Sequence, residues 1–104
     1  MKKNIWHPVE NNSDILVGQY IVPNFISNSI AIEASPSDIV VISPGQPLLE
    51  NCPKEWFETG VTLHLVMPNS FHYMGVAAWC KAFPQHKLYA SKGAIKRLSK
   101  VANL

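Results

Sequence analysis

Residues 61–83 read VTLHLVMPNSFHYMGVAAWCKAF, and this stretch decides the predicted fold. Its first seven residues, 61–67, form an apolar run of the length expected for a buried strand. Residues 71–83 are apolar on most sides and stop at Pro84, which cannot continue a helix. The stretch therefore predicts a buried strand, a short turn and a helix. Trp79 and Phe83 are one helical turn apart and are expected to lie in the core.

Upstream of this unit, the sequence predicts more strands and one helix. Residues 14–22 and 28–35 are rich in β-branched side chains and flank a turn-like segment, which predicts a hairpin. Residues 38–45 contain a short apolar run typical of a buried strand. Residues 51–60 predict a helix, with Gly60 able to adopt the left-handed conformation that caps a helix end.

Downstream, residues 86–91 predict a short strand and residues 91–102 predict an amphipathic helix. Strands separated by helices of this length are joined by right-handed crossovers, so part of the sheet should be parallel. We found no internal repeat or linker. The sequence thus predicts one α/β domain over residues 1–104 with a mixed sheet.

Charge is divided unevenly along the chain. Residues 1–60 hold seven acidic and three basic side chains, for a net charge of −4, whereas residues 61–104 hold six basic side chains and no acidic one. Nucleic acid, an anionic substrate or an acidic partner could meet such a basic surface, but a solvated helix face is the simplest interpretation. The absence of an aromatic platform or a recognised motif disfavours nucleic acid. The basic surface consists of Lys92, Lys96, Arg97 and Lys100.

The sequence predicts a cytoplasmic protein without a membrane segment. Its two cysteines are far apart and form no CxxC pattern, which suits a reducing compartment. The first residues lack the apolar stretch of a secretory signal. Residues 15–32 are uncharged, but proline, glycine and several polar residues interrupt them, unlike a spanning segment of about twenty apolar residues.

A series of short motifs runs in order through residues 28–91. These are Ser43 and Pro44 after a strand, Gly60 before the next strand, Pro68, Asn69 and His72 in the turn, Trp79 in the helix, and Phe83 and Pro84 before the following strand. In order and spacing they resemble a family of uncharacterised proteins related to the metallo-β-lactamase superfamily. The resemblance implies the N-terminal half of an αββα sandwich, with a mixed sheet and helices on one face.

The same resemblance implies that the metal site is incomplete. In active members of the superfamily the turn reads His-x-His-x-Asp-His. If His72 takes the last position, the other ligand positions fall on Met67, Asn69 and Phe71. A zinc hydrolase needs imidazole and carboxylate ligands, and these three residues do not supply them. We therefore expect no catalytic metal, and zinc or iron could bind only if another chain or segment completed the site.

Asn69 and His72 have two interpretations. Asn69 can cap the helix through its side-chain oxygen, with His72 hydrogen-bonded in the first turn, and this structural role is favoured. Alternatively, the two residues line a polar pocket at the carboxyl end of the strands, where α/β folds commonly bind ligands. Neither interpretation identifies a small-molecule ligand or a catalytic residue.

The remaining histidines and cysteines are weaker candidates. His64 lies within a strand, on the face opposite Val61, Leu63, Leu65 and Met67, and is interpreted as a hydrogen-bonded core residue or a half-buried one. His7 and His86 are expected at the surface. Cys80 is expected to be an inert buried thiol. Cys52 precedes a predicted helix start, where a thiolate would be favoured, but no histidine is fixed near it in the sequence.

Two classes of function fit these observations. The first is a metallo-β-lactamase-like, hydrolase-related protein with little independent catalysis. The second is a small non-catalytic binding or assembly module that acts as a homodimer. Half a sandwich leaves one sheet face bare, and Ile30 and Ile32 should point toward it, so we expect a homo-oligomer. In a rival arrangement the N-terminal segment folds back and covers this face with Ile5 and Trp6.

Overall fold

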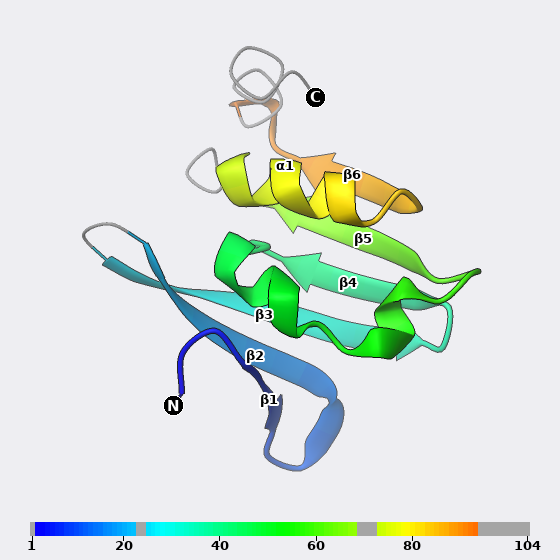
Figure 1. Cartoon of the computed structure of the whole chain (residues 1–104), viewed down its shortest axis with the longest axis horizontal. Coiled ribbons are helices and arrows are strands. Elements are labelled where there is room, and N and C mark those ends of the chain that lie inside the picture. The colour runs from blue at the N-terminus through cyan, green and yellow to red at the C-terminus, as the bar shows by residue number, and fades with distance from the viewer. Residues whose placement is uncertain (1, 23–24, 69–72, 94–104) are drawn as a thin grey trace.

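The strands lie side by side in the order in which they occur in the sequence (Figure 1). A computed structural model describes residues 2–22, 25–68 and 73–93. These form a mixed α/β domain with a six-stranded sheet of order β1-β2-β3-β4-β5-β6. The elements are β1 (Trp6–Val9), β2 (Asn12–Val22), β3 (Phe25–Ser35), β4 (Asp38–Ile42), η1 (Gln46–Asn51), η2 (Lys54–Phe57), β5 (Thr62–Met67), α1 (Tyr73–Ala82) and β6 (His86–Ala90), where η denotes a 3₁₀ helix.

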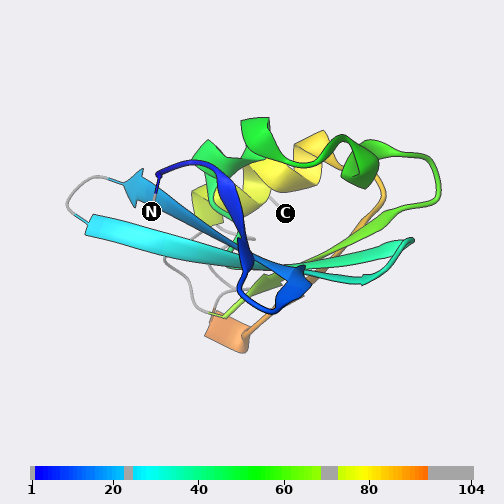
Figure 2. The same ribbon diagram turned by 90° about the horizontal axis from the view of Figure 1, so that it is seen from below.

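The first four strands form an antiparallel meander, and the last two strands are parallel to β4. The long hairpin of β2 and β3 confirms the predicted hairpin, and the β4–β5–β6 segment confirms the partly parallel sheet. Parallel neighbours need a crossover connection. One crossover contains η1 and η2, the other contains α1, and all three helices lie on the same face of the sheet (Figure 2).

The core lies between this sheet face and the helices, and aromatic side chains dominate it. Trp6 from β1, Trp56 from η2 and Trp79 from α1 are buried together, with ring centroids 5.5 to 6.4 Å apart. Phe83 stacks on Trp79 at 5.5 Å and is also buried. The predicted core positions Trp79 and Phe83 are therefore confirmed.

The N-terminal segment does not cover the opposite face of the sheet. Trp6 pairs with Gly18 across β1 and β2, and its indole packs against Trp56 and Trp79 on the helix side. The rival arrangement, in which the N-terminal segment covers the bare face with Ile5 and Trp6, was therefore wrong for Trp6. The physical reason is the strand period of two, which directs alternate side chains to opposite faces.

Residues 51–60 do not form the predicted helix. Two short 3₁₀ helices replace it, η1 starting earlier than expected and η2 spanning four residues. Cys52 separates them with an extended backbone (φ −65°, ψ 141°), because a residue that precedes a proline is disfavoured in the helical region. Gly60 does adopt a left-handed conformation, with φ 90°, at the turn into β5.

The other boundaries differ in smaller ways. The strand predicted over 38–45 ends at Ile42, because Ser43 turns the chain with φ 55°. Of the helix predicted over 91–102, only residues 91–93 are described, and Lys92 and Gly93 are helical. Lys96, Arg97 and Lys100 lie outside the described residues. Within residues 2–22, 25–68 and 73–93, no helix is long and apolar enough to cross a membrane.

Candidate functional site

The turn at residues 68–72, which the sequence suggested as a site, lies mostly outside the described residues. Asn69 and His72 lie outside the described residues. Met67, one of the three residues at the remaining ligand positions, is fully buried in the core. Among the described residues, no group of three or more histidine, cysteine, aspartate or glutamate side chains is arranged to hold a metal ion.

Neither cysteine has the environment of a reactive thiol. Burial raises the pKa of the Cys52 thiol to about 12, and its sulfur lies 3.6 Å from the carbonyl oxygen of Leu48. The expected thiolate-favouring position of Cys52 was wrong, because the predicted helix start is replaced by an extended residue between two short 3₁₀ helices. Burial also raises the pKa of Cys80, as expected for an inert core thiol.

The sheet face opposite η1, η2 and α1, which we call the open face, carries two cross-strand rows of side chains. Neighbouring strands place the members of each row directly beside one another. The first row is Val17, Ile30, Ile42 and Val66; the second row is Ile15, Ile32, Val40 and His64. Seven of these eight side chains are β-branched and aliphatic, so His64 is the polar exception.

Described side chains leave this face accessible to solvent. Ile30, at the centre of the first row, is 39% exposed, and Ile21 and Ile26 at the hairpin end are 59% and 55% exposed. The other aliphatic members of both rows are half-buried. The expectation that Ile30 and Ile32 point together toward an apolar face is thus confirmed.

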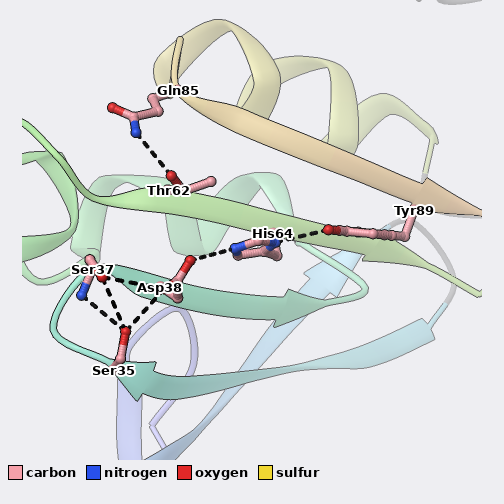
Figure 3. A network of polar contacts seen from close by, with 7 residues as sticks. All are labelled: Ser35, Ser37, Asp38, Thr62, His64, Gln85 and Tyr89. Atoms are coloured by element: carbon pink, nitrogen blue, oxygen red, sulfur yellow. Dashed lines mark hydrogen bonds and ion pairs between the residues drawn. The ribbon is translucent and has the colours of Figure 1, made fainter.

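His64 belongs to a polar cluster on the open face (Figure 3). Its Nε2 lies 2.9 Å from the Asp38 carboxylate and its Nδ1 lies 3.0 Å from the Tyr89 hydroxyl. Because a carboxylate only accepts hydrogen bonds, neutral His64 donates from Nε2 to Asp38 and accepts at Nδ1 from the Tyr89 phenol. The Tyr89 ring also stacks on the imidazole at 5.8 Å.

The turn between β3 and β4 completes the cluster. The hydroxyls of Ser35 and Ser37 donate to Oδ2 of Asp38 at 3.1 and 3.3 Å. The hydrogen bond from His64, followed by that from Ser35, lowers the pKa of the Asp38 carboxyl below its usual value. Asp38 is therefore ionised at neutral pH, with both carboxylate oxygens engaged by groups of its own chain.

The carboxylate–imidazole–phenol order can fix one tautomer and one orientation of the His64 ring. Together with Val40 and Val66, the cluster lines a shallow depression of about 600 Å³ on the open face. Side chains of Asp38 and Tyr89 are each 47% exposed, so water screens the charges in the free chain. The cluster is therefore accessible from solvent at two of its side chains.

The predicted strand position of His64 is confirmed, and of its two interpretations the half-buried one is correct. Its two partners, Asp38 and Tyr89, were not predicted, and they lie 26 and 25 residues away along the chain. The available signal was the pair of predicted parallel neighbours, β4 and β5. The sequence did not reveal the register between these strands, that is, which residues are paired. A shift of the pairing by one residue would move every side chain of a strand to the other face of the sheet.

In the part of the chain that the structure describes, the fold and this surface define a class of protein: a mixed α/β domain with helices on one sheet face and an apolar, solvent-accessible sheet on the other. In comparisons with known proteins, no family model and no curated protein sequence matches the chain.

Proposed function

We propose that this chain is an assembly module, in which the open face pairs with the open face of a second copy. The observation that carries the proposal is the pair of cross-strand rows, seven of whose eight members are β-branched and aliphatic. Monomeric proteins rarely expose a contiguous apolar patch of more than a few hundred Å². Covering the two rows removes this apolar surface from water.

The size of the open face suits a dimer. The strands β2 and β3 have 11 residues each, and the other four strands have four to six. At about 3.4 Å per residue and about 4.8 Å between strands, the projected area of the sheet is on the order of 700 Å², and upright side chains make the accessible area larger. A stable interface needs about 800 Å² per partner, so nearly the whole open face must take part.

The charges of the open face also suit a second copy. Asp38 and Lys87 are the charged side chains that the described strands place on this face, and their charges cancel within one copy. Two copies can therefore approach without net repulsion. A twofold axis would bring identical rows together, and two sheets pack well at about 10 Å with their strands roughly 30° apart.

Light scattering should give a mass near twice 11.6 kDa at micromolar concentration, falling toward 11.6 kDa on dilution. Replacing Ile30 with lysine should yield the monomer, because it places a charge at the centre of the first row. Ile30 is 39% exposed in the single chain, so the lysine is tolerated there.

Thr59→Lys provides a control of equal charge, since Thr59 is exposed in the loop before β5 and away from the open face. It should dimerise like the wild type. A wild-type mass of 11.6 kDa at every concentration would overturn the proposal, and so would an Ile30→Lys variant that dimerises with unchanged affinity.

We further propose that the domain is related to the metallo-β-lactamase-like hydrolases and has little catalysis of its own. The meander, the two parallel crossovers and the helices on one face support this relationship, because they fit the N-terminal half of an αββα sandwich. In such a sandwich the second half packs on the open face. The second copy in the proposed dimer would take that place.

Purified protein, after exhaustive dialysis, is expected to contain far less than one zinc, iron or manganese ion per chain. Met67 is buried and offers only a thioether, and Phe71 has no ligating atom, so the turn lacks the ligands that a hydrolase needs. Elemental analysis of the wild type and of His72→Ala checks this. One metal ion per wild-type chain that disappears in His72→Ala would contradict it.

A further inference from the structure

The polar cluster on the open face is satisfied by hydrogen bonds within its own chain. His64 uses both ring nitrogens, one toward Asp38 and one toward Tyr89. Asp38 receives two further hydrogen bonds, from Ser35 and Ser37. Side chains that face water do not need such partners, because water supplies them.

Hydrogen bonds within the cluster lower the free-energy cost of covering it with a partner. Burying a polar group without a hydrogen-bond partner is costly, whereas a group that brings its own partners can be covered by apolar side chains. His64 continues the second row directly beside Val40, so a partner that covers the row also covers the imidazole. Its side chain is already only 19% exposed in the free chain.

We infer that the Asp38–His64–Tyr89 cluster lies inside the contact between two copies, where aliphatic side chains of the second copy cover the His64 ring and exclude water from it. This inference rests on the proposed assembly through the open face. It makes the cluster a specificity element: a partner surface that carried its own hydrogen-bonding groups at this place would find no free donor or acceptor on His64.

Tyr89→Phe tests the inference because it removes one hydroxyl and leaves Nδ1 of His64 without its donor. Water replaces the donor in a single chain but not under the partner. The dissociation constant of the dimer should therefore rise by roughly a hundredfold, about tenfold for each of the two copies. In the monomeric Ile30→Lys background, Tyr89→Phe should change the melting temperature by no more than about two degrees.

Asn51→Ala is the matched control. The Asn51 side chain donates to the Asn4 carbonyl at 2.6 Å, and Asn51 is exposed at the end of η1, on the helix side of the sheet. Its removal should leave the dissociation constant unchanged.

A second measurement does not depend on a variant. Exchange of the imidazole C2 hydrogen with deuterium, followed by mass spectrometry, should slow at His64 when the protein concentration rises above the dissociation constant. His86, which hydrogen-bonds to the Phe83 carbonyl beside the helix layer, serves as the internal reference and should not change.

The outcomes separate the inference from the assembly proposal. If the wild type dimerises but Tyr89→Phe keeps the wild-type dissociation constant, or if His64 exchange does not slow, the inference is overturned and the assembly stands. If the wild type stays monomeric, both are overturned.

Discussion

Trp79→Ala is expected to lower the free energy of unfolding by about 3–5 kcal/mol, the usual cost of truncating a large buried aromatic side chain. Trp79 is fully buried and lies at the meeting point of α1, β1 and η2, where it contacts Trp6 and Trp56. Its indole N–H also donates to the Gly45 carbonyl at 2.9 Å. Alanine therefore leaves a cavity and removes the donor for a buried carbonyl.

A domain of this size is typically stable by about 5–15 kcal/mol, so this variant should lose a large part of its stability. Urea unfolding followed by circular dichroism measures the loss. Trp79→Phe is the informative comparison: it retains part of the packing but no N–H, and should fall between the wild type and alanine. Midpoints equal to that of the wild type would show that Trp79 is not a core residue.

Gly75→Ala is expected to lower the free energy of unfolding by about 2 kcal/mol, although alanine normally stabilises a helix interior by about 1 kcal/mol relative to glycine. Gly75 lies one turn before Trp79 on α1. A Cβ atom at this position would clash with the backbone carbonyl oxygen of Pro44 and would approach the Gln46 nitrogen to 3.2 Å. Unlike a flexible side chain, the backbone of Pro44 and Gln46 cannot rotate out of the way, so α1 must move away from the loop that precedes η1.

Gly93→Ala is the matched control for this steric argument. Gly93 lies in a helical segment, and no described atom lies within 4 Å of the place where its Cβ would be. The change should leave stability equal or slightly higher. Thermal unfolding of both variants makes the comparison, and a Gly75→Ala protein as stable as Gly93→Ala would show that α1 does not approach the loop closely.

The sequence alone predicted β2 to β6 and the partly parallel sheet, whereas β1 was not predicted. Alternating β-branched residues predicted the hairpin of β2 and β3, and two apolar runs predicted β4 and β5. Spacing within the helix also predicted that Trp79 and Phe83 share the buried face. These features depend on local periodicity, which a short window of sequence contains.

Residues 51–60 show where local signals failed. Glycine and proline at the expected positions suggested a helix, but the extended conformation that Pro53 favours at Cys52 divided the segment into η1 and η2. The core then favoured the divided form, because η2 places Trp56 against Trp6. Tertiary packing of this kind can override helix propensity, and the local sequence pattern contains no information about it.

Only the tertiary structure decided which residues meet on the open face. The sequence indicated that Ile30 and Ile32 share a face, but strand register put them in rows with residues from β2, β4 and β5. Register likewise brought Asp38 and Tyr89 to His64, across 26 and 25 residues of chain. The reason is physical: the strand period of two assigns each residue to a face, whereas the pairing between strands, set by the whole core, determines its neighbours.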